Sequence, residues 1–426
     1  MLDDEPATLV TPGRLRATQF GDYLVVERLG TGGMGSVDLA VHVPEGGVGR
    51  PVALKRLRAD LCRDERFTSM FQDEVRIAAR LSHPHVARLL DAGVHRGELY
   101  FTMDLLIGVP LSQLIKHLNA SSNEALHARW PAILTRLIID ACEGLHAAHE
   151  LCDETGQPLG VIHRDVSPDN LFVGFDGGVR VIDFGIASAH DRLTRTATGN
   201  VRGKIGYLAP ERFQVPTTID RRVDVWALGV VLWEGLALGS LFDQKNALDM
   251  LTAIRAGDIP PVTERRPGVP PEVIAVLEQA LQTDAAERYP TARSMAVELT
   301  RAAIEVGWVA GLHDVAEWTN QLLPDAARRQ ERLAQMAARA RRDTIDLELP
   351  EAEDEGATLV HPPDRIRPEA DSFQPPASSW SDTDEVATRQ QPPDRLAMPT
   401  LYLVLLLVAS TGLGLLLGGL MWLVLG

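Results

Sequence analysis

The chain is poor in cysteine, has no surplus of positive charge and lacks an apolar leader. Its three cysteines, Cys62, Cys142 and Cys152, have no metal-site spacing and leave an odd thiol, so we expect reduced structural thiols in the cytosol. A formal net charge of −16 argues against nucleic acid as the main partner, because phosphate backbones are bound through basic side chains. Residues 1–22 show no apolar run behind a basic start, which excludes a secretory signal peptide and predicts a flexible segment inside the cell.

The composition nevertheless supports a packed enzyme. Hydrophobic residues make up 45% of the chain and charged residues 23%, as in globular proteins. A length of 426 residues exceeds one ordinary core and suits two lobes with appended segments.

The pattern of apolar residues predicts a small mixed lobe followed by a mainly helical lobe. From Tyr23, short β-like runs separated by glycines (YLVVERL, SVDLAVHV, PVALKRL) indicate an antiparallel sheet. Residues 66–81 place apolar side chains at helical spacing, which predicts one amphipathic helix beside that sheet. Helices are also expected over residues 126–150, 223–238 and 272–306.

The C-terminal part changes character twice. The stretch after Trp318, AARRQERLAQMAARARRD, predicts a solvated basic helix, which we interpret as a spacer within a helical extension over residues 306–345. Residues 346–398 are rich in proline and acidic side chains, which predicts a disordered linker because little apolar surface can be buried. Leu401–Gly426 has no charged residue and would span about 39 Å as a helix, so we expect a transmembrane helix over residues 399–426. A buried core helix is the alternative, but no packing partner is evident.

Two motifs suggest a phosphate-binding site in the small lobe. Residues 29–37, LGTGGMGSV, follow a predicted strand and place glycines where a backbone can approach phosphates. Eighteen residues past Val37, the run VALK places Lys55 on a strand, where its ammonium can hold phosphates. Glu74 follows on the amphipathic helix, and its carboxylate can pair with Lys55. Taken separately, an ordinary hairpin, a surface lysine and a solvated glutamate remain the alternatives.

The run VIHRDVSPDNLFV carries the decisive chemistry. It offers Asp165 as an acceptor for a hydroxyl proton and Asn170 as an oxygen ligand for Mg²⁺. Asp183 follows in VIDFG as a second hard oxygen ligand. With LAPE (residues 208–211) and DVWALG (residues 224–229), this set resembles the protein-kinase signature over about residues 23–305, and GTGGMG is similar to bacterial eukaryotic-like (Hanks-type) Ser/Thr kinases.

The resemblance implies an α+β, bilobal protein-kinase fold that uses ATP and Mg²⁺ to phosphorylate protein hydroxyls, including its own. Lys55, paired with Glu74, would orient ATP, and Asp165 would position the hydroxyl. Asn170 and Asp183 would bind Mg²⁺, Met103 would be the gatekeeper, and Glu211 would pair with Arg288. His163 would serve packing and hydrogen bonding rather than act as a base. The implied nucleotide contacts are Leu29, Gly30, Thr31, Gly32, Gly33, Met34, Gly35, Ser36, Val37, Ala53, Lys55, Met103, Asp104, Leu106 and Phe172.

Two positions depart from the family pattern. Ser167 stands where most Ser/Thr kinases have lysine, and Lys204 stands where they have threonine. Because both family residues contact the catalytic aspartate, we hypothesise a swap in which Lys204 supplies the missing charge and Ser167 the missing hydroxyl. Drift in a weakly active enzyme is the alternative.

Regulatory and partner sites are also predicted. Arg164 would receive a phosphate from Thr194, Thr196 or Thr198 in the activation segment. The repeat DEPATLV and DEGATLV makes Thr8 and Thr358 candidate docking phosphosites for forkhead-associated domains. Small residues at four-residue spacing in the apolar tail, Ser410, Gly414 and Gly418, permit a homodimer in the inner membrane, with the kinase domain in the cytoplasm.

Three functions compete at this stage. The first is an active Ser/Thr protein kinase. A pseudokinase scaffold that recruits partners at the membrane is disfavoured because Lys55, Asp165, Asn170 and Asp183 are all present. A small-molecule kinase of related fold is disfavoured by LAPE, which frames the peptide-docking segment in protein kinases.

Overall fold

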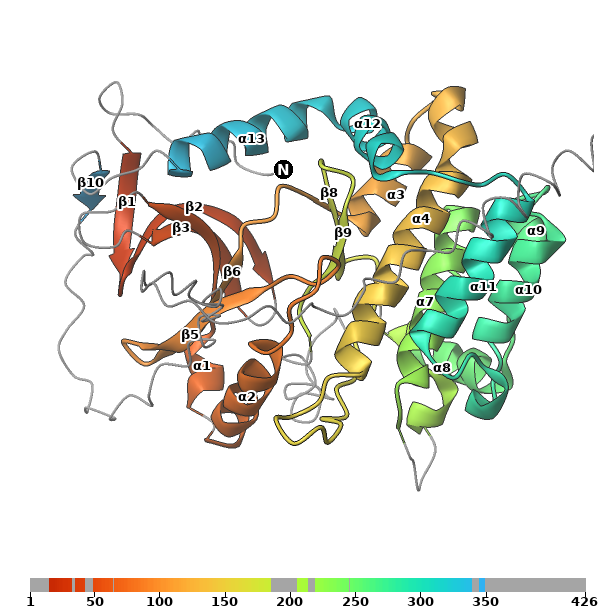
Figure 1. Cartoon of the computed structure of the whole chain (residues 1–426), viewed down its shortest axis with the longest axis horizontal. Coiled ribbons are helices and arrows are strands. Elements are labelled where there is room, and N and C mark those ends of the chain that lie inside the picture. Colours follow the sequence, from red (N-terminus) through yellow and green to blue (C-terminus); the bar gives the residue numbers. More distant parts are fainter. Residues whose placement is uncertain are drawn as a thin grey trace, which may run out of the picture. The chain divides into compact units, whose positions relative to one another are not determined.

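The computed structural model describes residues 15–32, 35–42, 49–63, 65–184, 205–213, 219–244, 246–338 and 345–348. The chain divides into two compact units, Met1–Ala370 and Asp371–Gly426, and all described residues belong to the first. Within that unit a β-sheet lobe precedes a helical lobe (Figure 1). The predicted bilobal α+β architecture is therefore confirmed.

The small lobe is built on one seven-stranded sheet. Its strands, in spatial order, are β10 (Ile345–Glu348), β1 (Leu15–Phe20), β2 (Tyr23–Gly32), β3 (Gly35–His42), β4 (Arg50–Leu57), β6 (Glu98–Asp104) and β5 (Leu89–His95). All neighbours are antiparallel except β1 and β10, which are parallel. The consecutive hairpins β2–β3–β4 follow from the alternating apolar runs separated by glycines.

Two short helices accompany the sheet, α1 (Ala59–Cys62) and α2 (Glu65–Ala78). Phe67, Phe71 and Val75 of α2 are fully or almost fully buried, in a cluster with residues of β4, β5 and β6. The predicted amphipathic helix is thus confirmed, and its apolar spacing places it against the sheet because those side chains share one face.

Residues 105–107 connect β6 to the large lobe and are called the hinge here. After it come β7 (Gly108–Pro110), α3 (Leu111–Asn119) and α4 (Glu124–His149). The hairpin β8 (Leu171–Gly174) and β9 (Val179–Val181) completes a three-stranded sheet with β7. This small sheet carries the segment between Asn170 and Asp183.

The rest of the large lobe is helical. It contains the 3₁₀ turns η1 (Pro210–Phe213) and η2 (Ala285–Glu287), and the helices α7 (Arg222–Ala237), α8 (Ala247–Ala256), α9 (Val262–Arg265), α10 (Pro271–Ala280) and α11 (Ala292–Glu305). Helix α7 is buried on nearly every side and packs against α4 and α10. The predicted helical end over residues 272–306 is split, because Thr291 caps α11 through a reciprocal bond with Ser294.

Two flanking segments belong to the small-lobe sheet, which corrects the expected boundaries. Leu15–Phe20 forms β1 although the segment up to residue 22 was expected to be flexible. Ala17 and Phe20 are buried, and Gly21 adopts a φ of +58° in the turn to β2. Ile345–Glu348 pairs with β1, so the start of the expected linker is a strand here.

The helical extension consists of α12 (Leu312–Leu322) and α13 (Pro324–Ala338). Interpreting the basic stretch as a solvated spacer is wrong, because α13 contacts β3, β4 and β7 and its Ala337 is only 1% exposed (Figure 1). Among the described residues, no helix is both long and apolar enough to cross a bilayer. The predicted transmembrane helix over residues 399–426 lies outside the described residues.

Candidate active site

Asp224 fixes the loop over residues 161–170, which carries the signature run VIHRDVSPDN. Its carboxylate, at the start of α7, accepts hydrogen bonds from the backbone N–H groups of His163 and Arg164 at 2.8 Å each. The Nε2 atom of the buried His149 lies 2.8 Å from the same carboxylate. Burial acts to raise the pKa of Asp224, but the hydrogen bond and charge of His149, with the other donors, lower the pKa below its usual value. The loop is therefore tied to the most buried helix of the lobe.

His163 is occupied by structural contacts. Its Nδ1 accepts a hydrogen bond from the Asp165 N–H at 3.2 Å, so Nε2 carries the proton that it shares with the Ile182 carbonyl at 2.9 Å. The ring packs edge-on against Phe184, with centroids 4.7 Å apart. This confirms the expectation that His163 serves packing and hydrogen bonding.

Asp165 and Asn170 lie side by side in the loop. The Asn170 side-chain Nδ2 donates to the Asp165 carbonyl at 2.7 Å and to its carboxylate at 3.0 Å. The Asn170 carbonyl accepts from the Ile182 N–H at 3.0 Å, which brings Asn170 next to the strand end that carries Asp183. With its nitrogen engaged in this way, Asn170 has its amide oxygen available for a cation.

Lys55 joins this group from the small lobe. Its Nζ lies 2.6 Å from Oδ1 of Asp183, and its side chain is only 11% exposed. Asp183 has a φ of +61° and Arg164 one of +65°, which are uncommon backbone conformations for residues other than glycine. Such conformations often occur at functional sites, where surrounding contacts stabilise them.

The donor set fits Mg²⁺. The Asn170 amide oxygen and the Asp183 carboxylate are hard oxygen ligands, and Mg²⁺ commonly takes one or two of these from the protein and the rest from phosphates and water. The described residues include no group of three or more His, Cys, Asp or Glu side chains able to hold a metal.

The β2–β3 hairpin and its neighbours form the expected nucleotide surface. Val37 pairs with Lys55, and Ala53 pairs with Leu39 and Met103, so alternation places Val37, Ala53 and Lys55 on one face. Gly30 and Gly32 have open space where a Cβ would lie, whereas a Cβ at Gly35 would collide with the Arg56 carbonyl. Leu29, on β2 a few residues before the turn of the hairpin, is 45% exposed.

The other expected contacts come from the connecting strands. Met103 and Asp104 end β6, Leu106 lies in the hinge, and Phe172 lies on β8. Thr31 and Ser36 face each other across the β2–β3 ladder, while Gly33 and Met34 lie outside the described residues.

Several of the predicted residues have side chains that the structure does not describe. Glu74 lies on α2 but its side chain is not described, so the expected pair with Lys55 stays a prediction. Lys204, Thr194, Thr196, Thr198, Thr8, Thr358 and the apolar tail also lie outside the described residues. Ser167 is 3% exposed, and its hydroxyl has no hydrogen-bond partner within the described ranges.

The predicted pair of Glu211 and Arg288 is confirmed. Two parallel hydrogen bonds of 2.8 Å join them, and the Arg288 side chain has no exposed surface. The guanidinium also lies 4.9 Å from the ring of Trp226. The role of Asp224 was missed, because the DVWALG motif does not reveal that its aspartate meets a loop 60 positions earlier.

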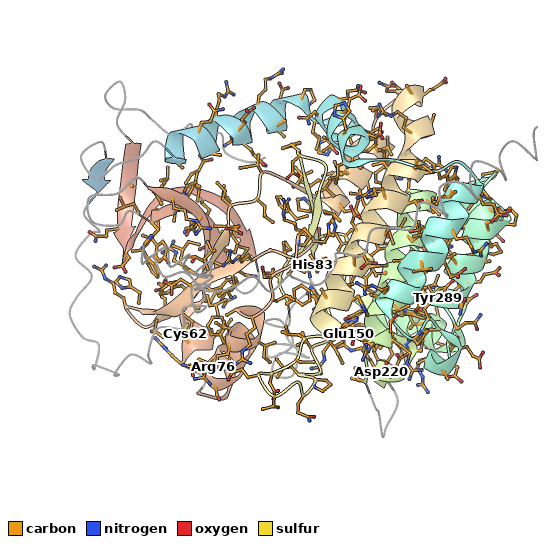
Figure 2. All side chains as sticks on the ribbon, in the orientation of Figure 1. Cys62, Arg76, His83, Glu150, Asp220 and Tyr289 are labelled. Carbon is orange, nitrogen blue, oxygen red and sulfur yellow. The ribbon has the colours of Figure 1, made fainter. Side chains whose placement is uncertain are left out.

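None of the three cysteines, all of which lie among the described residues, forms a disulfide. Cys62 lies at the small lobe (Figure 2), Cys142 is buried in α4 and Cys152 is exposed. Burial raises the pKa of the Cys142 thiol, which keeps it protonated and unreactive.

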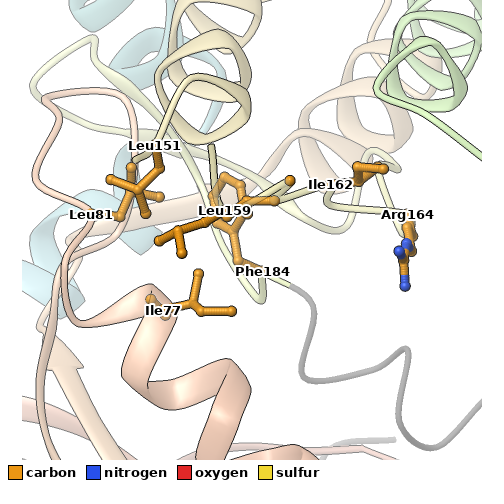
Figure 3. Close-up of a pocket in the computed structure, with 10 residues that line it drawn as sticks. Ile77, Leu81, Leu151, Leu159, Ile162, Arg164 and Phe184 are labelled. Atoms are coloured by element: carbon orange, nitrogen blue, oxygen red, sulfur yellow. The ribbon is translucent and has the colours of Figure 1, made fainter. Parts of the chain in front are cut away.

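A separate pocket of about 170 Å³ borders the loop at Ile162 and Arg164 (Figure 3). Its lining also includes Ile77, Leu81, Leu151, Leu159 and Phe184. Its lining is apolar apart from Arg164, so it lacks the oxygen donors of the site above.

Comparison with known proteins gives a consistent result. Residues 23–299 match the family model described as "Protein kinase domain". The chain is 40% identical over 277 residues to the tyrosine-protein kinase MasK of Myxococcus xanthus, covering 65% of this chain and 42% of that protein. It is 34% identical over 341 residues to the serine/threonine-protein kinase PknB of Mycolicibacterium smegmatis, covering 77% of this chain and 49% of that protein. The chain thus spans less than half the length of these curated relatives.

A solved structure agrees with the fold. The kinase domain of Mycobacterium tuberculosis PknI superposes with a TM-score of 0.51 at 26% identity, over 67% of this chain and 98% of that one. The serine/threonine-protein kinase PrkC of Bacillus subtilis is a further relative, 29% identical over 66% of this chain and 40% of its own length.

Proposed function

Because the chain belongs to the protein kinase family, we propose that it transfers the γ-phosphoryl group of ATP to serine and threonine hydroxyls of proteins, itself included, in bacterial signalling. The observation that carries the proposal is the convergence of Lys55 on Asp183, next to the bonded pair of Asp165 and Asn170. Relatives named as serine/threonine-protein kinases at 29–35% identity support the choice of acceptor.

Each side chain has a role in this mechanism. The Lys55 ammonium binds the α- and β-phosphates and holds the Asp183 carboxylate in place. Asp165 accepts a hydrogen bond from the acceptor hydroxyl and aims it at the γ-phosphoryl group, and Asn170 fixes the Asp165 carboxylate. Asn170 and Asp183 would hold Mg²⁺, which would supply charge neutralisation at the phosphates.

We further propose that Lys204 and Ser167 have swapped the roles of the family residues, so that Lys204 supplies the missing positive charge and Ser167 the missing hydroxyl. A buried Ser167 hydroxyl without a described partner suits a position that bonds to a neighbouring polar group during turnover. Lys204→Ala should lower phosphoryl transfer nearly as much as Asp165→Ala does. Unchanged transfer in Lys204→Ala would favour drift of both positions instead.

Tyrosine is the second candidate acceptor. The relative of 40% identity is named a tyrosine-protein kinase, and Ser167 replaces the lysine common in Ser/Thr kinases. Acid hydrolysis of the labelled product followed by phosphoamino-acid separation distinguishes the two. Label only in phosphotyrosine would replace the Ser/Thr assignment.

The test of the proposed function uses the full chain with γ-labelled ATP, Mg²⁺ and a generic protein substrate. Wild type should label the protein, while Asp165→Asn and Asp183→Asn should lower the rate by about 10²–10³-fold. Asp176→Asn is the matched control, because Asp176 is an aspartate of the β8–β9 turn paired with Arg180. Wild-type binding of nucleotide without transfer would indicate the pseudokinase scaffold, and transfer only to small molecules would indicate the third alternative.

We also propose that activation-segment phosphorylation acts through Arg164. Its buried Nε atom has no hydrogen-bond partner within the described residues, which suits an arginine that receives a phosphate. Mass spectrometry of ATP-treated protein should find phosphate on Thr194, Thr196 or Thr198. Finding all three unmodified would remove this switch.

For location and partners, we propose a single-pass anchor over residues 399–426 in the inner membrane, with the kinase domain in the cytoplasm. The absence of charge over Leu401–Gly426 supports it. Carbonate-resistant membrane association of the full chain, lost on deletion of this segment, is the expected result. Recovery of the full chain in the soluble fraction would contradict it.

Two interactions extend this proposal. Phosphorylated Thr8 or Thr358 would bind forkhead-associated domains, and absence of phosphate at both sites in cells with active kinase would end that idea. The Ser410, Gly414 and Gly418 face would support a homodimer, and a tail that stays monomeric in a bilayer association assay would count against it.

A further inference from the structure

The C-terminal extension is fastened to the large lobe through α12. Trp318 stacks on Trp130 of α4 with ring centroids 5.0 Å apart, and its indole N–H donates to the Leu126 carbonyl at 3.0 Å. A Cβ at Gly177, in the β8–β9 turn, would collide with the Leu312 carbonyl at the start of α12. Because Trp318 is fully buried, this end of the extension is a fixed support.

From that support α13 reaches the end of the hinge. The Gln330 side chain accepts a hydrogen bond from the Gly108 N–H at 2.7 Å and donates one to the Gly108 carbonyl at 2.8 Å. Gly108 directly follows the hinge and begins β7, which pairs with the β8 strand that carries Phe172. The Gln330 side chain therefore holds both backbone groups of Gly108, the first residue after the hinge.

The far end of α13 packs on the small lobe. Leu333 and the hinge residue Leu105 pack against a cluster that includes Leu39, Val41 and Ala337. An ion pair of 3.1 Å links Arg329 to Glu27 of β2. Helix α13 thus contacts β7, directly after the hinge, and β3 and β4 of the small-lobe sheet.

The contact on the small lobe lies on the nucleotide-facing side of the sheet. Leu39 and Val41 alternate in phase with Val37 on β3, so these side chains share a face. Leu39 is also the ladder partner of Ala53, an expected adenine contact. A displacement of Leu333 would therefore disturb this cluster, whose Leu39 lies beside the expected adenine contact Ala53.

We propose that α13 is a brace that sets the position of the hinge relative to the small-lobe sheet, with Gln330 as a positioning residue for nucleotide binding. The inference rests on the proposed function, because ATP is the ligand whose binding it concerns. The brace holds the hinge and the adenine face of the sheet in register before ATP arrives, which lowers the ordering cost of binding.

The test compares Gln330→Met with Gln335→Met in the full chain. Methionine keeps the length of the Gln330 side chain but removes both hydrogen bonds to Gly108. Gln335 is an exposed glutamine of the same helix whose side chain reaches only Glu331 among the described residues, at 3.4 Å, so it is the matched control. Calorimetric titration with ATP and MgCl₂ gives Kd, and initial rates give KM for ATP and kcat.

For Gln330→Met we expect Kd and KM for ATP to rise by roughly three- to tenfold, from the loss of two hydrogen bonds that are each worth a modest amount. The kcat should change less than about twofold, because the side chains that transfer the phosphoryl group are untouched. Hydrogen exchange of the Gly108 amide should also become faster, while Gln335→Met should match wild type throughout.

A second variant, Leu333→Ala, tests the proposal independently in case Gln330→Met misfolds. Leu333→Ala leaves the Gln330 bonds intact and weakens only the small-lobe contact, so it should raise Kd in the same direction. If both variants had a lower melting temperature but unchanged Kd and KM for ATP, α13 would only stabilise the fold, and the brace proposal would be overturned. Wild type that binds no ATP would instead overturn the proposed function, so the two failures are distinguishable.

Discussion

The two lobes hold their shares of the site in different ways. In the large lobe, buried polar groups hold the chain in place. Asp224 binds the backbone of His163 and Arg164 in the loop, and the fully buried Arg288 binds Glu211 in η1. In the small lobe, Gly30 and Gly32 are open and Leu29 is 45% exposed. Site geometry and fold stability are therefore linked in the large lobe, whereas the glycine-rich residues 29–32 of the small lobe have room to adjust to a nucleotide.

The largest expected effect is on Asp224. Asp224→Ala leaves the His149 imidazole and two backbone N–H groups without their buried acceptor, so the free energy of unfolding should fall by about 3–5 kcal/mol. Denaturant titration measures it. Asp220→Ala is the control, because Asp220 pairs with Arg222 near the surface and should cost only about 0–1 kcal/mol. Equal losses in the two variants would remove the contrast between buried and surface contacts.

A change of similar size tests whether the extension belongs to the large lobe. Trp318→Ala removes a fully buried side chain stacked on Trp130 and should lower the free energy of unfolding by about 3–4 kcal/mol. The measurement is again denaturant unfolding. A loss below about 1 kcal/mol would show that α12 is an attached appendage rather than part of the lobe.

The pH dependence sharpens the same contrast. The folded-state pKa of Asp224 is lowered, so its stabilisation is complete above its unfolded pKa of about 4 and is lost as pH falls through the lower folded value. Wild type should therefore lose its stability advantage over Asp224→Asn as the pH drops below about 4. An advantage that stays constant down to pH 2 would contradict this origin.

In the small lobe a large functional effect should come with a small structural one. Lys55→Met removes the charged partner of Asp183, but the Asp183 side chain is 27% exposed and stays in contact with water, so the free energy of unfolding should change by less than about 1 kcal/mol. Phosphoryl transfer should nevertheless fall by about 10²–10³-fold. Strong destabilisation by this variant would mean that the small lobe is as rigidly built as the large one.

The smallest effect on stability is expected within the glycine-rich residues 29–37. A Cβ at Gly30 meets nothing within 4 Å, so Gly30→Ala should leave the free energy of unfolding within about 0.5 kcal/mol of wild type. Gly35→Ala should be clearly less stable, because its Cβ would collide with the Arg56 carbonyl. Thermal unfolding of the two variants side by side checks the difference.

The sequence was sufficient for what is encoded locally. Motif spacing predicted Lys55, Asp165, Asn170 and Asp183 as site residues, and the structure brings them close together. Apolar spacing predicted α2, because each of these signals lies within a short window. The pairing of β1 with β10 was missed, since it joins segments more than 300 positions apart and neither has a strong strand signal. Such contacts depend on the tertiary fold rather than on local preference.

The sequence of α13, which was misinterpreted as a solvated spacer, contains a pattern from which its packing could have been predicted. Its exposed arginines, Arg328, Arg329 and Arg332, dominate the composition and suggest a solvated helix. Gln330, Leu333 and Ala337 nevertheless recur at helical spacing and form the narrow face that packs. A short apolar face of this kind is easily masked by average composition.

Calorimetric titration of the full chain with ATP, in the presence and absence of Mg²⁺, tests the convergence of Lys55, Asp165, Asn170 and Asp183 most directly. Wild type should bind one ATP more tightly with Mg²⁺, and Asp183→Asn should lose that Mg²⁺-dependent gain while Asp176→Asn keeps it. No ATP uptake by wild type with Mg²⁺, or an unchanged Mg²⁺ gain in Asp183→Asn, would contradict a shared nucleotide and metal site.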